Sequence, residues 1–224
     1  AYHMLGMVEM KEKNFRQAFG FFSKAVELDP ALVEAQLELG KLFLAGKALD
    51  RAREKSALLL AADPANKEAR LLEAGVLLGE DRDDAARTLL TTLIEGGFQH
   101  PDAYFMLASA YDRQKNLAQV EKVLQAGIAA NPDSVPLHLV LVRLYAREKQ
   151  FDKAIAETEA VIALEPDKPA HQLMLARLFH DAGRTDAMHD VLRNLLTNSP
   201  EDETTRIQVA GFLMRAGNSE KAEQ

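Results

Sequence analysis

The apolar positions of this chain follow the spacing of one face of an α-helix. Leu39 is followed four residues later by Phe43, and Leu107 is followed in the same way by Tyr111. Residues three or four apart lie on one side of an α-helix, whereas strand residues that share a face are two apart. No segment has a convincing strand pattern. The sequence therefore predicts an all-α protein.

The helical pattern repeats with a period of 34 residues, and prolines mark the period. Five prolines and one phenylalanine stand on a single 34-residue lattice: Pro30, Pro64, Phe98, Pro132, Pro166 and Pro200. Proline disfavours the helical conformation of the residue before it, so helices usually end there. Each lattice point therefore marks the end of a helix.

Two helices fit into each period. A column of mostly small residues lies in the first helix: Gly6, Gly40, Ala74, Ala108, Val142, Ala176 and Ala210. A second column follows twelve residues later: Ala18, Ala52, Ala86, Val120, Ala154, Met188 and Ala222. A bulkier, mostly apolar column begins at Phe22, four residues further on. Small residues allow two helices to approach, and short breaks such as Lys13-Asn14 and Ala182-Gly183-Arg184 predict tight turns between them.

Each period is therefore a helical hairpin. One such hairpin buries too little apolar surface alone, so neighbouring hairpins must stack into a superhelix with a continuous core and a concave inner surface.

The motif Leu5-Gly6, Ala18, Phe22, Ala25 and Pro30 resembles the tetratricopeptide repeat family, and the resemblance covers the whole chain. It implies a right-handed α-solenoid of antiparallel helix hairpins, with about six and a half units. The expected repeats are residues 1–32, 33–66, 67–100, 101–134, 135–168, 169–202 and a partial repeat 203–224. The aromatic residue that the family often has near the start of the first helix is present at Tyr2 and Tyr104. Polar residues replace it at Gln36, Arg70, His138, Gln172 and Arg206.

Residues 1–224 are expected to form a single superhelix. Because the sequence starts at Ala1 and stops at Gln224 inside helical patterns, we expect it to be a fragment of a longer protein.

The third repeat ends differently, at Glu95-Gly96-Gly97. Glycine permits positive φ and often ends a helix. We favour an ordinary helix terminator here, with a hinge between repeats three and four as the alternative.

Composition narrows the function classes. The chain has no cysteine, which excludes disulfides and thiolate metal sites and leaves both the cytosol and the bacterial periplasm open. A net charge of −7 disfavours binding along nucleic-acid phosphates. No apolar run approaches the roughly 20 residues of a membrane-spanning helix, so direct membrane insertion is not expected.

No motif carries catalytic or cofactor chemistry. The six histidines form no pair with the spacing of metal ligands on one helix face, and phosphate-binding loops and nucleophile turns are absent. The sequence therefore predicts no enzyme, metal site or cofactor.

In the tetratricopeptide family, certain positions of the first helix face the concave groove. The first such column is largely apolar: His3, Leu37, Leu71, Phe105, Leu139, Leu173 and Ile207. These residues would either form an apolar stripe that contacts a partner helix or peptide, or help to pack the hairpins together.

Two further groove columns become rich in arginine from the fourth repeat onward. One contains Met7, Lys41, Gly75, Ser109, Arg143, Arg177 and Gly211, and the other contains Lys11, Ala45, Gly79, Arg113, Arg147, Asp181 and Arg215. The arginines would attract an acidic segment or a terminal carboxylate. The alternative is that they pair with nearby acids such as Asp112 and Asp181 and are functionally neutral.

The leading hypothesis is a protein-interaction scaffold that binds a peptide or helix of a partner in its groove. The Ala- and Leu-rich, cysteine-free repeats look bacterial. Similar long repeat arrays serve in cell-envelope assemblies, so the resemblance implies an envelope or secretion assembly as the setting. The alternative is a spacer or an oligomerisation arm, with self-association, and a weaker third is an exopolysaccharide-binding module. The lysine and asparagine pattern with which some family members bind chaperone termini is absent, since Leu71, Phe105 and Leu139 stand in place of lysine.

Overall fold

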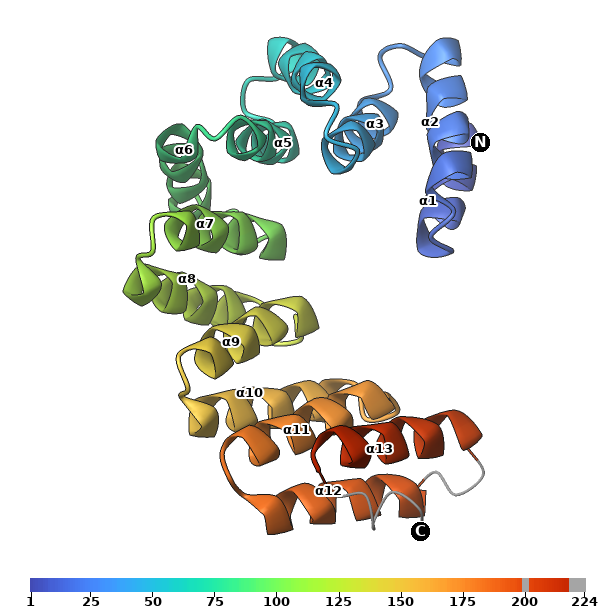
Figure 1. Ribbon diagram of the computed structural model, residues 1–224. Helices are drawn as coiled ribbons and strands as arrows, with labels where there is room; N and C mark the ends of the chain where they lie inside the picture. Colours follow the sequence, from blue (N-terminus) through green and yellow to red (C-terminus); the bar gives the residue numbers. More distant parts are fainter. Residues whose placement is uncertain (199–201, 218–224) are drawn as a thin grey trace. The chain divides into compact units, whose positions relative to one another are not determined.

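The computed structural model describes residues 1–198 and 202–217, and these residues form thirteen α-helices and no strand (Figure 1). This confirms the all-α helical-hairpin solenoid. The first helices of the hairpins are α1 (Tyr2–Lys11), α3 (Val33–Ala45), α5 (Lys67–Gly79), α7 (Pro101–Arg113), α9 (Val135–Arg147), α11 (Pro169–Asp181) and α13 (Glu203–Arg215). The second helices are α2 (Phe15–Leu28), α4 (Leu49–Ala62), α6 (Asp83–Glu95), α8 (Leu117–Ala130), α10 (Phe151–Leu164) and α12 (Thr185–Asn198). Pro200 and Ala222, which the sequence assigns to two of its columns, lie outside the described residues.

The chain divides into two compact units, residues 1–123 and 124–224, which we call the N-terminal and C-terminal units. The division falls within α8. In the N-terminal unit, α1 packs on α2, α3 on α4 and α5 on α6. In the C-terminal unit, α9 packs on α10 and α11 on α12. Each unit thus consists of antiparallel hairpins that contact their neighbours.

The turn inside each hairpin places one residue in the left-handed region of backbone conformation. These residues recur every 34 positions: Lys13, Lys47, Asp81, Lys115, Lys149, Gly183 and Gly217, with φ between 56° and 78°. A side chain costs about 1–2 kcal/mol in this region, and glycine avoids that cost. Only Gly183 and Gly217 avoid it. The other turns carry side chains at this position and are closed by local backbone hydrogen bonds, such as that from the N–H of Asn14 to the carbonyl oxygen of Glu9 at 2.8 Å.

Gly96 and Gly97 end α6 inside the N-terminal unit. Gly97 has a φ of 78°, and its N–H donates to the carbonyl oxygen of Ile94 at 2.9 Å. The N–H of Phe98 donates to the carbonyl oxygen of Leu93 at 3.0 Å. The other described connections between hairpins use extended residues such as Asp29 and Asp63 instead. The glycine pair therefore acts as a helix terminator, and it turns Phe98, which replaces the lattice proline, onto the core around Leu90.

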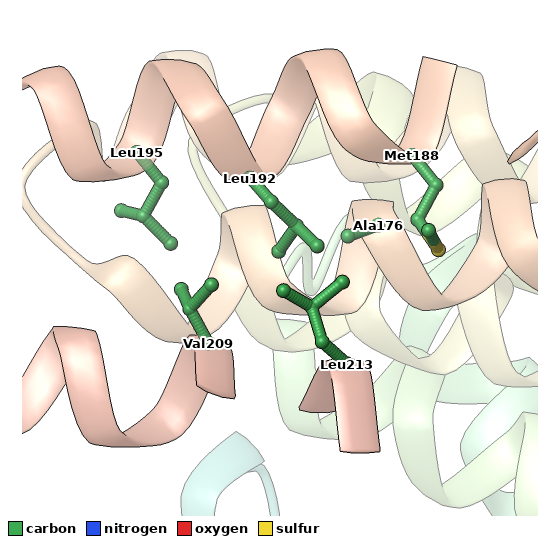
Figure 2. Close-up of a cluster of buried hydrophobic side chains, with 6 residues drawn as sticks. All are labelled: Ala176, Met188, Leu192, Leu195, Val209 and Leu213. Carbon is green, nitrogen blue, oxygen red and sulfur yellow. The ribbon is translucent and has the colours of Figure 1, made fainter. Parts of the chain in front are cut away.

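The predicted small and bulky columns form the core. In the N-terminal unit Ala18, Phe22 and Leu39 make one buried cluster, and Gly6 is buried against the ring of Phe22. In the C-terminal unit Figure 2 shows three side chains of α12 pointing toward α11 and α13. The residues of this cluster are Ala176, Met188, Leu192, Leu195, Val209 and Leu213. The polar members of the bulky column, Ser56 and Thr158, donate to helix carbonyls of Arg53 and Ala154.

Four of the five polar residues that replace the family's aromatic have the same kind of hydrogen-bond partner. Their side chains lie within hydrogen-bond distance of the carbonyl oxygen of the lattice proline six residues earlier. The pairs are Gln36 with Pro30 (2.9 Å), Arg70 with Pro64 (2.9 Å), His138 with Pro132 (3.2 Å) and Gln172 with Pro166 (3.5 Å). At Tyr104 the residue six positions earlier is Phe98, which replaces the lattice proline. It is buried, and burial raises the pKa of its hydroxyl.

Ion pairs also join neighbouring hairpins in the N-terminal unit. The guanidinium of Arg53 on α4 donates through Nε to Oε1 of Glu80 at 2.9 Å and also through Nη2, and Arg82 lies 3.5 Å from the other oxygen of Glu80. The bonds from Arg53, followed by those from Arg82, hold the pKa of the Glu80 carboxyl below its ordinary value. A paired carboxylate of this kind makes stability depend on pH.

Glu80→Gln is expected to lower the melting temperature at pH 7, because it removes the ion pair with Arg53. The expected loss is only about 1–3 °C, since the pair is largely exposed on the Arg53 side. Since the pKa of Glu80 is depressed in the folded state, its contribution is fully present above the unfolded pKa of about 4.3 and is lost as the pH falls through the folded value. Melting curves followed by circular dichroism at pH 7 and at low pH should therefore differ between wild type and variant only at pH 7. An equal difference at both pH values would contradict this assignment.

Candidate functional site

The predicted apolar column does not form a continuous exposed stripe. Leu71 is buried in the core with Ala74 and Leu90. Leu37, Leu139 and Leu173 are half-buried. Only Phe105, at 45% exposed, and Ile207, at 64% exposed, present large apolar surfaces to solvent. At Leu71 this column therefore packs hairpins together, while Phe105 and Ile207 remain available for contact.

In the N-terminal unit two basic residues of the other two columns, Lys41 and Arg113, already have acidic partners. Lys41 lies 3.1 Å from a carboxylate oxygen of Glu38 and 3.9 Å from one of Glu68. Ser109 is half-buried, and Gly75 of the same column is buried against Leu44.

Arg113, at the end of α7, is held by the turn of the preceding hairpin. Its Nη1 donates to the carbonyl oxygen of Leu78 at 2.9 Å and to carboxylates of Asp81 at 2.8 Å and Asp83 at 3.2 Å. Asp81 and Asp83 neutralise this arginine. Its role in the structure is to join two hairpins.

Three arginines of the C-terminal unit are more weakly paired. Arg177 is 76% exposed, with Asp181 at 3.9 Å. Arg143 and Arg215 are exposed, and within the described residues neither has a carboxylate at ion-pair distance. Exposed single pairs are weak, so these three guanidinium groups keep most of their capacity to bind an external anion. Arg147 differs from them, because it is engaged within the chain and lies 3.4 Å from Glu148.

Charge is segregated between the two kinds of helix in this unit. The first helices α9, α11 and α13 carry five arginines and two carboxylates: Arg143, Arg147, Arg177, Arg206 and Arg215, with Asp181 and Glu203. The second helices α10 and α12 carry the reverse, five carboxylates and two basic residues: Asp152, Glu157, Glu159, Asp186 and Asp190, with Lys153 and Arg193. The first helices are therefore locally positive in a chain of net charge −7.

A cavity of about 230 Å³ lies between α11 and α13. Its lining consists of Arg177, His180, Asp181, Phe212, Arg215 and Ala216. The ring of His180 meets the ring of Phe212 edge to face at 6.4 Å between centroids, and its Nδ1 lies 3.2 Å from Asp181. The cavity combines two guanidinium groups, one carboxylate and one aromatic face.

Of these residues, Arg177 and Arg215 were predicted from the sequence as groove residues, whereas His180 and Phe212 were not. Their spacing in the sequence could have indicated these two residues. Arg177 and His180 are three residues apart on α11, as are Phe212 and Arg215 on α13. That spacing places each pair on one helix face.

Three other histidines, His100, His138 and His171, have hydrogen-bond partners within the protein. His138 Nδ1 lies 2.6 Å from Glu157 and joins α9 to α10, and His171 Nε2 lies 2.7 Å from Glu165. Lys168 and then His171 hold the pKa of the Glu165 carboxyl below its ordinary value. The ring of His100 accepts from the N–H of Asp102 at the start of α7. Within residues 1–198 and 202–217 no group of three potential ligands could hold a metal ion.

Two of the four tyrosines, Tyr104 and Tyr145, are buried and offer no flat surface to a sugar ring. Among the described helices none has the length and apolar content required to cross a bilayer.

Models of the tetratricopeptide repeat match most of the sequence. One matches residues 3–67 and 77–135, and another matches residues 114–178. No curated protein matches the sequence.

Several solved structures have a similar fold. PilW, described as a widely conserved type IV pilus biogenesis factor, is 19% identical, with a TM-score of 0.68 over 92% of this chain and 95% of PilW. PilF of Pseudomonas aeruginosa is 20% identical, with a TM-score of 0.64 over 90% of this chain and 91% of PilF. A chain of the APC/C hetero-tetramer Cut9–Hcn1 is 12% identical, with a TM-score of 0.65 over 97% of this chain and 44% of that one. At these identities the likeness is one of fold.

Proposed function

The chain belongs to the tetratricopeptide repeat family, and on this basis we propose that it is a protein-interaction scaffold whose C-terminal unit binds an acidic segment of a partner protein. The observation that carries the proposal is the segregation of charge, which concentrates arginine on α9, α11 and α13. Arginine binds carboxylates through two parallel hydrogen bonds and adds long-range attraction. We propose a protein partner and not nucleic acid, because the chain as a whole is negative.

The apolar contacts of the proposed site come from the same helices. Leu139 and Leu173 are half-buried and Ile207 is exposed, so each first helix offers an apolar side chain four residues before its arginine or glycine. A peptide or helix with mixed acidic and apolar residues would match this surface. In the N-terminal unit, Phe105 and Leu37 would provide apolar contacts, while Lys41, Ser109 and Arg113 have the partners or the burial described above.

The test is affinity capture from a lysate with wild type and with Arg143→Glu combined with Arg177→Glu. We expect the double charge reversal to lose the partner, because it replaces attraction by repulsion on the proposed surface. The control is Lys122→Glu combined with Arg193→Glu, which changes the charge equally on the second helices α8 and α12. Circular dichroism should show that all three proteins are equally helical. A partner captured equally by all three would contradict the proposed surface.

A second candidate function is a spacer or an oligomerisation arm. One observation favours it: on α1 the residues Leu5 and Val8 are 46% and 51% exposed, whereas the residues equivalent to Leu5 in later repeats, Leu39 and Leu107, are buried. A stable homodimer in solution that is lost in Leu5→Ser combined with Val8→Ser, with no captured partner, would support this role.

The cellular setting of the proposed function depends on the identity of the partner. PilW is a pilus biogenesis factor, and its likeness to this chain is a likeness of fold. A captured component of an envelope or secretion assembly would extend the proposal to that setting. Neither cofactor nor catalytic residue belongs to the proposed site.

A further inference from the structure

The cavity between α11 and α13 differs from the equivalent place in the N-terminal unit in a way that points to a ligand. Arg215 ends α13 as Arg113 ends α7, three repeats earlier in the 34-residue lattice. Both positions follow the turn of a preceding hairpin. The two arginines differ in the residues that stand in the turn of the preceding hairpin.

For Arg113, the turn contributes two carboxylates, Asp81 and Asp83, at 2.8 and 3.2 Å from Nη1. At the corresponding positions three repeats later, the turn between α11 and α12 has Gly183 and Thr185. Neither residue carries a charge. Arg215 therefore lacks the acidic partners that Arg113 has. Instead it lines the cavity of about 230 Å³.

The remaining charges of the cavity leave it positive. Arg177 faces the same space from α11, with Asp181 as its only ion-pair partner in the described residues, at 3.9 Å. Asp181 is also 3.2 Å from His180. One carboxylate stands against two guanidinium groups, so one further carboxylate would neutralise the cavity.

We infer that this cavity binds a carboxylate of an acidic peptide segment, held between Arg177 and Arg215 at the position that the turn acids occupy around Arg113. The inference rests on the proposed function and names its anchoring site. Phe212 and the ring of His180 form the apolar wall, which contacts the methylene groups of the bound side chain or its neighbour in the peptide. The carboxylate belongs either to a side chain or to a peptide's carboxyl end.

The experiment measures binding of two fluorescein-labelled peptides by fluorescence anisotropy at low salt. One is a poly-glutamate peptide with an amidated carboxyl end, and the other is a poly-glutamine peptide with a free one. We expect wild type to bind at least one of them and Arg215→Gln to weaken that binding by about tenfold, the loss of one charge-assisted pair. Binding of the first peptide alone would identify side-chain carboxylates as the ligand, and binding of the second would identify the terminal one.

Arg113→Gln is the matched control, because it removes the equivalent arginine where internal acids already neutralise it. We expect it to bind the peptide as wild type does, with circular dichroism confirming that both variants are helical. Unchanged binding by Arg215→Gln overturns the inference. If Arg143→Glu with Arg177→Glu then still loses the captured partner, the proposed function stands and only the cavity is excluded. A wild-type protein that binds neither peptide also overturns the inference.

Discussion

Leu192→Ala is expected to lower the free energy of unfolding by about 2–5 kcal/mol, the largest effect we predict for a single substitution. Leu192 is 3% exposed and packs between Met188, Leu195 and Leu213 in the C-terminal unit (Figure 2). Truncation removes the transfer free energy of the side chain and leaves a cavity. The helix backbones around that cavity are held by their own hydrogen bonds, so the cavity closes only in part.

Urea unfolding followed by far-ultraviolet circular dichroism measures this loss. Asn194→Ala is the control, since Asn194 is exposed on the same helix and should change stability by less than about 0.5 kcal/mol. Because stability in repeat proteins is a sum of local terms, amide exchange in Leu192→Ala should accelerate most in α11, α12 and α13. A loss of stability no greater than that of Asn194→Ala would show that the cluster is not close-packed.

Gly40→Val is expected to destabilise the protein by about 1–3 kcal/mol through overpacking. Gly40 is buried on α3, and a Cβ atom there would lie 2.3 Å from Cδ2 of Leu72 and 3.2 Å from Cβ of Lys55. Leu72 is itself only 3% exposed, so displacing it disturbs the core. The contact with Lys55 is made by its Cβ atom, which moves only with the backbone of α4, so α3 and α4 must separate. The loss of stability therefore comes from the close contact between helices, which explains why this column holds mostly small residues.

Gly20→Ala is the matched comparison. Gly20 lies on α2 with a helical backbone, and a methyl group added there would have no neighbour within 4 Å beyond its own helix backbone and the adjacent residues. Alanine there should raise stability by about 0.5–1 kcal/mol, because glycine is a poor helix former. Both variants are measured by urea unfolding. Equal effects of the same sign would contradict the claim that close approach, and not helix propensity, determines the residue at position 40.

The helices and their 34-residue period can be predicted from the amino-acid sequence alone. The first helices begin at residues 33, 67, 101, 135, 169 and 203, the residues at which the sequence places the starts of its repeats. Proline, glycine and the spacing of apolar residues act within one hairpin, so they can be read without knowledge of the neighbours. The helix end at Gly96-Gly97 can likewise be predicted from these residues alone.

Whether a residue of a column is buried, paired or exposed depends on contacts between hairpins, which the sequence does not show. Leu71 and Phe105 occupy one column, but Leu71 is buried and Phe105 is exposed. Arg113 and Arg215 share another, but Arg113 is bound to Asp81 and Asp83 while Arg215 lines a cavity. Burial and pairing depend on the side chains that the adjacent hairpin brings into contact, and a column compares equivalent positions without showing those contacts. The pairing of Gln36, Arg70, His138 and Gln172 with proline carbonyls was missed for the same reason.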